Sequence, residues 1–278
     1  MLRLEPHAQP SVVWRYASPI LALGITVLIG VLLFVVLGKD PVKGLGVFFW
    51  EPIKSVYALS ELLVKATPLL LIALGLAVCF RSNVWNIGAE GQFVMGAVFA
   101  AGVALMAQAD DSSAYWVLIL LGGMVGGMLW AAVTALLRDK FNANEILVSL
   151  MLVYVAVMVL NFLVYGPWKD PMGYNFPQTK TFEVVTQIPK LVTGTRVNIG
   201  VLLALFGVGA LWVFLFRTHA GFAQQVGGLA PHAARYAGFS SRRALWLALL
   251  TSGATAGLAG ALEVAGPLRQ LTPFVPAG

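Results

Sequence analysis

The stretch YWVLILLGGMVGGMLWAAVTALL, residues 115–137, decides the fold class. It carries no charged residue, and a helix needs about 20 apolar residues to cross a bilayer. Strands of a membrane barrel alternate lipid-facing and lumen-facing residues over about ten positions. Because this stretch is continuously apolar, we expect a membrane-spanning α-helix.

Further apolar runs lie on both sides of it, each bounded by charge, glycine or proline. The first run ends at Gly38-Lys39-Asp40-Pro41 without a small-residue cleavage site, which indicates a retained helix and not a signal peptide. The seven expected spans are residues 20–37, 62–80, 91–107, 115–137, 146–165, 199–216 and 244–263. We therefore predict an all-α, polytopic transmembrane helical bundle that forms a single domain over residues 1–278.

Composition supports the same class. Of the 278 residues, 59% are hydrophobic and 11% are charged, whereas ordinary soluble domains have about 25% charged residues. The net charge of +6 contains no basic run denser than Arg242-Arg243, so it indicates lipid headgroups and topology more than nucleic acid. The single cysteine, Cys79, excludes an intrachain disulfide.

Lysine and arginine divide equally between the two sides of such a bundle. The charges on one side abut helix ends in short loops, which count most for orientation, so they weakly favour a cytoplasmic N-terminus. Residues 1–18 and 217–243 are then cytoplasmic, and residues 166–196, which contain four prolines, form an extracytoplasmic loop or small cap.

Motifs of covalent chemistry are missing from the sequence. There is no Walker A pattern, no H-E-x-x-H and no G-x-S-x-G, and His7, His219 and His232 are not spaced as metal ligands. We therefore expect no enzyme, no metal and no cofactor. If ATP drives the protein, the ATPase is another chain.

Residues 86–92, NIGAEGQ, place three hydrogen-bonding side chains between two apolar runs: Asn86, Glu90 and Gln92. Polar groups and irregular backbone at membrane depth face protein or a watery cavity, so the stretch is a candidate lining of a translocation path. The alternative is a cytoplasmic turn in which Glu90 stabilises the start of the next helix.

Three further acidic sites stand out, and the first two are open to two interpretations each. Asn144 and Glu145 either lie beside the path or form the N-cap and first turn of the next helix. Glu263 either lines the path or reaches the membrane surface. Glu61 and Lys65 have the spacing of an ion pair along one helix.

Two sets of glycines have the G-x-x-x-G spacing that lets membrane helices approach closely. They are Gly122, Gly123, Gly126 and Gly127 in one run, and Gly253 and Gly257 in another. We expect them to pack helices within this chain, although association of two copies would use the same spacing.

The connection over residues 217–243 is long for a helix bundle, in which links of roughly 2–8 residues are usual. Pro231 can begin a short helix and Gly238 can end it. Alanines give this helix a small surface, and Arg235 and Tyr236 offer contacts. We expect it to fit a groove of another protein, unless it is only a link on the lipid surface.

These residues resemble a known family. The motifs are NIGAEGQ, the run Asn144-Glu145-Ile146 ahead of Leu150-Met151-Leu152, and the sequence AARYAG from Ala233 to Gly238. In this combination and order they are similar to ATP-binding cassette (ABC) importer permeases of the branched-chain amino acid, ribose and nucleoside superfamily, most like the nucleoside-type subgroup.

The resemblance implies a multi-pass chain of the bacterial plasma (inner) membrane with its N-terminus inside. It implies three partners: a cytoplasmic ATP-binding cassette ATPase, a second permease subunit and an extracytoplasmic lipoprotein or solute-binding receptor. It also implies that the ATPase is coupled through a loop that contains Gly227, Ala233, Ala234, Arg235 and Gly238.

The sequence departs from the family pattern in two places. Val153 stands where an asparagine is usual, and the family continues with further helices beyond Gly278, so we expect a C-terminally truncated chain.

The function predicted from all of this is half of the import path for nucleosides or related ribose-bearing solutes. A permease for a simple sugar is the first alternative. An ion-coupled secondary transporter, with Glu90 and Glu263 as coupling carboxylates, is the second.

Overall fold

The computed structural model describes residues 12–275, and within that range the regular secondary structure is helical apart from one isolated bridge between Lys190 and Asn198. Seven of the helices in the described range are long and apolar enough to cross a membrane, which confirms the predicted all-α class. The chain divides into two compact units, Met1–Leu59 and Ser60–Gly278, which are described separately.

The first unit begins, in its described part, with α1 (Val12–Val36), in whose apolar window no residue is buried. A short helical segment follows, made of α2 (Pro41–Leu45), a π-helical turn (Gly46–Trp50) and a 3₁₀ turn (Glu51–Ile53). Asp40 caps α2, because its side chain accepts a hydrogen bond from the Val42 amide at 2.9 Å. The helical structure of residues 41–53 was not predicted from the sequence, because two prolines and two glycines interrupt the segment.

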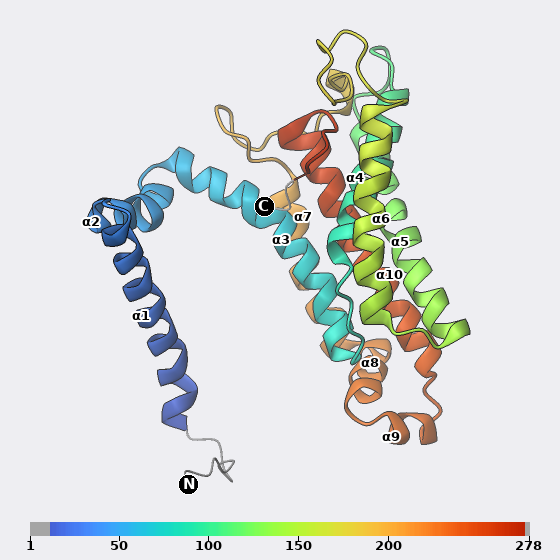
Figure 1. The fold of residues 1–278 in the computed structure, drawn as a ribbon. Helices are drawn as coiled ribbons and strands as arrows, with labels where there is room; N and C mark the ends of the chain where they lie inside the picture. The colour runs from blue at the N-terminus through green and yellow to red at the C-terminus, as the bar shows by residue number, and fades with distance from the viewer. Residues whose placement is uncertain (1–11, 276–278) are drawn as a thin grey trace. The chain divides into compact units, whose positions relative to one another are not determined.

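The remaining helices are shown in Figure 1. They are α3 (Val56–Arg81), α4 (Ala89–Met106), α5 (Tyr115–Phe141), α6 (Glu145–Tyr165), α7 (Gly200–Arg217), α8 (His219–Leu229), α9 (Pro231–Tyr236), α10 (Ser241–Glu263) and a final π-helical turn (Val264–Leu268). Several helices start earlier than the apolar runs, as α10 does with Ser241, Arg242 and Arg243. In α10 the Ser240 side chain caps the helix by accepting from the Arg243 amide at 3.3 Å.

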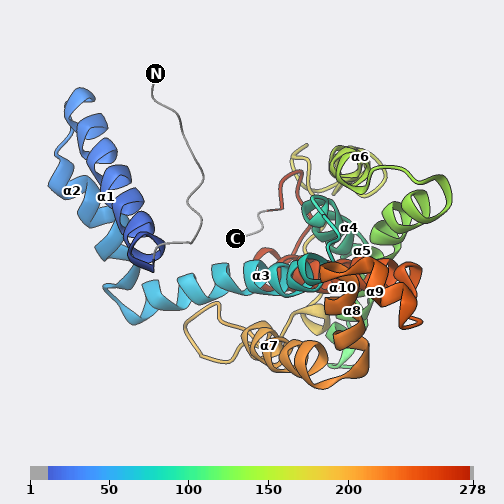
Figure 2. The same cartoon turned by 90° about the horizontal axis from the view of Figure 1, so that it is seen from below.

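Helices α4, α5 and α10 pack together at the centre of the second unit, as seen from below in Figure 2. Their contact is built on glycine. A Cβ added at Gly127 would overlap the Gly253 carbonyl and the Gly257 backbone, and one added at Gly96 would overlap Gly257. Close approach of this kind gives dispersion contacts that larger residues would prevent. The predicted packing of the glycine faces within the chain is therefore confirmed.

The segment of residues 166–196, which follows α6, lies along the chain that follows α10. Backbone amides of Thr179 and Phe182 donate to the carbonyls of Leu271 and Arg269, at 3.0 and 2.9 Å. Arg196 donates to Glu61 of α3 through Nε at 3.0 Å. The segment is therefore bonded to both α3 and the chain that follows α10.

Candidate functional site

The connection between α7 and α10 contains two helices. Thr218 caps α8, since its hydroxyl accepts from the Gly221 amide at 3.0 Å. Pro231 occupies the first turn of α9, and the chain leaves that helix through Gly238, whose φ of +82° is easy only for glycine. The short helix predicted from Pro231 and Gly238 is confirmed. The sequence analysis missed α8, for which the capping threonine was the available signal.

Helix α9 offers two kinds of side chain. Ala234 is buried and faces the rest of the protein, whereas Arg235 is exposed and Tyr236 is 97% exposed. Ala233 and Gly238 are exposed, and a Cβ at Gly227 would meet nothing within 4 Å. The available contact surface of α9 is therefore Arg235 and Tyr236 with the flanking small residues, while Ala234 sets how closely the helix packs.

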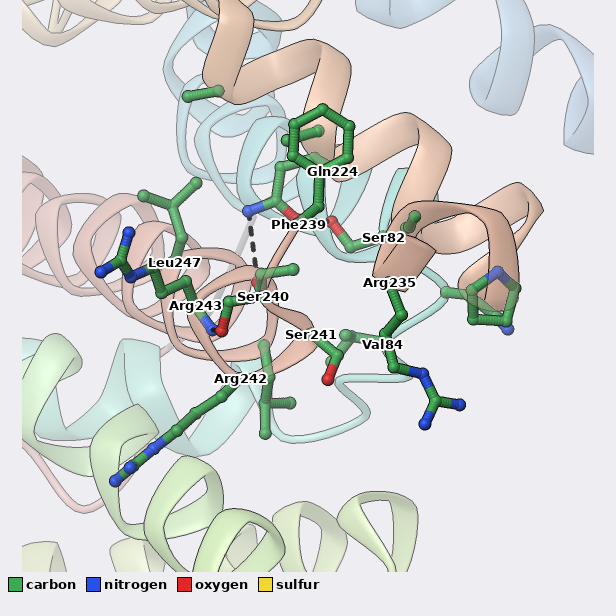
Figure 3. A pocket seen from close by; sticks show the side chains of 18 of the residues that line it. Ser82, Val84, Gln224, Arg235, Phe239, Ser240, Ser241, Arg242, Arg243 and Leu247 are labelled. Atoms are coloured by element: carbon green, nitrogen blue, oxygen red, sulfur yellow. Dashed lines mark hydrogen bonds between the residues drawn. The ribbon is translucent and has the colours of Figure 1, made fainter. Parts of the chain in front are cut away.

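A cavity of about 1010 Å³ lies between α9 and the bundle. Its lining includes the end of α3, the end of α5, helices α8 and α9, and the start of α10. Figure 3 shows the Arg235 side chain pointing away from Arg242 and Arg243. The charges of this region are thus spread over the cavity rim and do not converge on one point.

Gln224 joins α8 to the bundle. This side chain is only 2% exposed, its amide donates to the Ala244 carbonyl at 3.2 Å (Figure 3), and its Oε1 accepts from the Ser82 hydroxyl. Nearby, a Cβ at Gly228 would overlap the carbonyl of Arg81. The end of α3 and the start of α10 are therefore both held by α8.

Asp139 makes a second connection at the same end of the bundle. Its Oδ2 lies 2.7 Å from Arg242 Nε and accepts from the Trp246 indole at 3.1 Å. Because Arg242 and Trp246 belong to the first turns of α10, the end of α5 and the start of α10 are joined. Neither this pair nor Gln224 was identified from the sequence, because the partners are distant along the chain.

The NIGAEGQ motif forms the link into α4. Residues 84–88 are not helical, α4 begins at Ala89, and Glu90 lies exposed in its first turn. Asn86 is buried and donates to Gln92 Oε1 at 3.0 Å and to the Ser252 hydroxyl at 2.9 Å. Gln92 is buried too and donates back to Asn86 at 3.2 Å. The two amides therefore satisfy each other and hold the irregular link against α10.

The glycines of the motif serve helix packing. A Cβ at Gly88 would lie 2.7 Å from the Ser149 carbonyl oxygen, and one at Gly91 would lie 2.9 Å from the Val153 Cα. Both contacts bring the start of α4 against α6. Val153, the departure from the family pattern, thus lies at the contact between α4 and α6.

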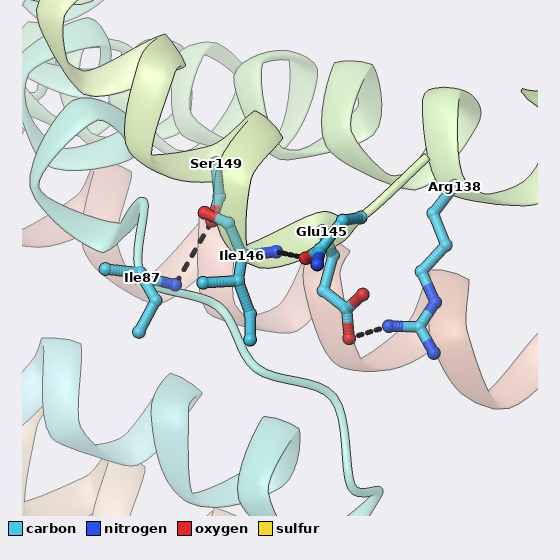
Figure 4. Close-up of polar contacts among 6 residues, drawn as sticks. Ile87, Arg138, Glu145, Ile146 and Ser149 are labelled. Atoms are coloured by element: carbon cyan, nitrogen blue, oxygen red, sulfur yellow. Dashed lines mark hydrogen bonds and ion pairs between the residues drawn. The ribbon is translucent and has the colours of Figure 1, made fainter. Parts of the chain in front are cut away.

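Glu145 begins α6 and lies beside Arg138, as Figure 4 shows. Asn144 is the N-cap and accepts from the Ile146 amide at 2.9 Å, and Glu145 forms an ion pair with Arg138 of α5. In the same region Ser149 accepts from the Ile87 amide at 3.2 Å. The helix-start interpretation of Asn144 is confirmed, and the ion pair spans the turn between α5 and α6.

Glu263 lies at the far end of α10, only 3% exposed. It borders a cavity of about 10 Å³ together with Thr67, Asn198 and Pro267, and Lys65 and Arg196 are the neighbouring cations. A space of this size suits one water molecule. Glu263 thus lies away from the other candidate residues, at the opposite end of α10.

Among residues 12–275, no group of three or more His, Cys, Asp or Glu side chains could hold a metal ion. The chemistry of the site is hydrogen bonding, ion pairing and helix packing. Such an arrangement can transmit movement between α9 and the bundle.

The sequence is similar to those of known transport proteins. A family model described as "Branched-chain amino acid transport system / permease component" matches residues 58–272. The glucose ABC transporter permease protein TsgB13 of Haloferax volcanii is 34% identical, over 95% of this chain and 72% of that protein.

Two further relatives are named for nucleosides. The guanosine ABC transporter permease protein NupP of Bacillus subtilis is 28% identical, over 88% of this chain and 70% of its own. The nucleoside ABC transporter permease protein NupB of Lactococcus lactis is 27% identical, over 87% and 68%. No solved structure matches.

Proposed function

The chain belongs to the family of branched-chain amino acid transport system permease components and is a permease subunit of an ABC importer, and from this premise we propose that its solutes are nucleosides or related ribose-bearing molecules. The chain would form half of the transmembrane path. Permease subunits are not themselves enzymes, so ATP hydrolysis belongs to a separate ATPase.

The proposed assembly is a transporter of a bacterial plasma membrane that contains this chain, a second permease subunit, an ATPase and a receptor. Two permease subunits enclose the path, a cytoplasmic ATP-binding cassette ATPase drives it, and an extracytoplasmic lipoprotein receptor delivers the solute. The N-terminus and residues 217–243 would be cytoplasmic, and the segment over residues 166–196 would face the receptor.

Helix α9 carries the coupling part of the proposal. It projects Arg235 and Tyr236 outward, and it is joined to the bundle through α8, with Gln224 holding Ser82 and Ala244. A push on α9 by the ATPase would therefore reach the ends of α3 and α10 as a rigid-body movement. The residues proposed for coupling are Gly227, Ala233, Ala234, Arg235 and Gly238.

The proposed path residues have different roles. Asn86 and Gln92 would shape the irregular link before α4, because each bonds the other and both are buried. Glu90 is exposed and could meet solute or the second subunit directly. Asn144 and Glu145 would hold the start of α6 beside them.

Charge reversal at Arg235 tests the coupling role. In the reconstituted transporter with its ATPase, Arg235→Glu should reduce ATP-driven uptake at least tenfold, because the exposed contact changes sign, while the membrane-inserted amount of the chain stays unchanged. Lys140→Glu, an exposed cation at the end of α5 and outside the coupling loop, is the matched control and should transport normally. Wild-type uptake by Arg235→Glu would contradict the assignment.

A sugar is the second candidate solute, because the relative named for glucose is 34% identical and the two named for nucleosides are 28% and 27% identical. Uptake of labelled guanosine and labelled glucose, measured in cells with and without this chain, separates the two. Loss of guanosine uptake alone supports the proposal, and loss of glucose uptake alone replaces it.

A further inference from the structure

The segment of residues 39–54 lies between two membrane spans, α1 and α3. Consecutive spans are joined at one surface of the bilayer, so a helical connection between them is held at that surface. Nothing in the proposed transport function uses this segment, which is neither an apolar span nor an extended loop.

One side of the segment is apolar. Val42, Leu45, Phe49 and Ile53 recur at intervals of three or four residues, which places them along one stripe of a helix. Phe49 and Ile53 are 53% and 56% exposed, and the exposed ring of Phe48 packs edge-on against Phe49 at 5.0 Å between centroids. This is a row of large apolar side chains presented outward.

The charged residues lie on another side, which they share with the exposed Val47. Lys43, Glu51 and Lys54 follow each other at intervals of eight and three residues, which places them on a second stripe. All three are exposed, and Lys54 pairs with Glu51 at 3.0 Å. With Lys39 and Asp40, the segment has three cations against two anions, a small positive excess.

Two contacts tie the segment to α1: a Cβ at Gly44 would lie 2.6 Å from the Phe34 ring, and the Lys39 amide donates to the Phe34 carbonyl at 2.8 Å. The contacts hold α2 against the end of α1. The aromatic row from Phe48 to Trp50 remains outside these contacts and is exposed.

We propose that residues 39–54 form an interfacial anchor that binds the phospholipid surface. The apolar stripe and Trp50 would insert at the boundary between headgroups and acyl chains, and the lysines would lie against headgroup phosphates. Amphipathic helices with aromatic apolar faces and lysines opposite bind membranes in this way, and tryptophan concentrates at that depth. A lipid surface fits better than a second protein subunit, because the span ends already place the segment at it.

The experiment measures the depth of single positions. Cys79 is the chain's one cysteine, so a Cys79→Ala background accepts an environment-sensitive fluorophore at Phe49→Cys or Ile53→Cys on the apolar stripe. Lys43→Cys and Lys54→Cys on the charged stripe are matched controls. The full chain is reconstituted in vesicles of phosphatidylethanolamine and phosphatidylglycerol, then exposed to iodide in water or to lipids with a quencher on the upper acyl chain.

The proposal expects the apolar positions to be quenched by the lipid probe and shielded from iodide several-fold better than the charged positions. Iodide quenching of Phe49→Cys as strong as that of Lys43→Cys would overturn it, because the stripe would then lie in water. Shielding of Phe49→Cys from both quenchers would also overturn it, in favour of a protein partner. The measurement needs no transport, so its result is independent of the proposed function.

Discussion

The α4–α5–α10 centre and the α8–α9 region of the same unit are built in opposite ways. At the centre, Gly96, Gly127 and Gly257 bring backbones together, leaving no room for an added Cβ. Around α8 and α9, a cavity of about 1010 Å³ remains, and polar connections such as that of Gln224 hold the parts. We infer from this difference that the centre resists deformation. The α8–α9 region has space to move, and its side-chain hydrogen bonds determine which helices move with it.

The largest effect is expected from Gly127→Leu. The side chain would overlap the backbone at Gly253 and Gly257, neither of which has atoms that can turn aside. The cost should be at least about 3 kcal/mol, at the upper end for overpacked cores. Apparent Tm and the yield of monodisperse protein in detergent should both fall sharply.

Gly24→Leu in α1 is the control for that substitution, because a Cβ at Gly24 would meet nothing within 4 Å. It adds the same side chain to a membrane span and should leave both readouts near wild type. Equal loss in the two variants would show that close glycine packing does not distinguish the centre.

A smaller effect is expected from Gln224→Leu. The substitution removes the side-chain donor to the Ala244 carbonyl and one of the two acceptors, Gln224 Oε1 and the Val78 carbonyl, available to the Ser82 hydroxyl proton. Loss of hydrogen bonds at a buried site costs about 1–3 kcal/mol. Tm should fall by a few degrees, and uptake per ATP hydrolysed should fall further, since α8 no longer holds both helices.

Gln108→Leu provides the comparison for Gln224→Leu, since Gln108 is an exposed glutamine just beyond the C-terminal end of α4. It should keep the wild-type ratio of uptake to hydrolysis. If Gln224→Leu lowered Tm but left that ratio unchanged, Gln224 would be a stabilising residue without a part in coupling.

The smallest effect on stability is expected from Ala234→Leu. Ala234 is buried but borders the cavity, so the added atoms have space that Gly127 lacks. The free energy of unfolding should change by about 1 kcal/mol or less. Uptake should nevertheless be uncoupled from ATP hydrolysis, because the leucine would fill part of the space in which α9 moves. Ala233→Leu, on the exposed side, tests whether this space or the contact surface matters.

Much of the fold followed from apolar run length. The seven spans, the packing of the glycine faces within the chain and the short helix after Pro231 were all predicted, because each depends on neighbours within one helix or on a known spacing. The boundaries were less accurate: α3 begins at Val56 and carries Pro68 inside, where polar residues had suggested a later start.

The hydrogen bonds and ion pairs of the site could not be predicted from run length or spacing. Glu61 and Lys65 have the spacing of a helical pair, yet Glu61 bonds Arg196 from a segment 135 residues away. Gln224 bonds Ser82, and Asp139 bonds Arg242, again over long separations. Periodicity reports which residues share a helix face, but it holds no information on which distant face they meet.

By itself the sequence determined that the chain lives in a membrane, how many spans cross it and which family it resembles, because these follow from local composition and short motifs. Only the tertiary structure decided that Asn86 and Gln92 bond each other beside Ser252, that Ala234 faces inward and that Glu263 lies apart. Those facts depend on how helices far apart in the chain pack, and a hydrogen bond or a buried side chain exists only once its partner is in place.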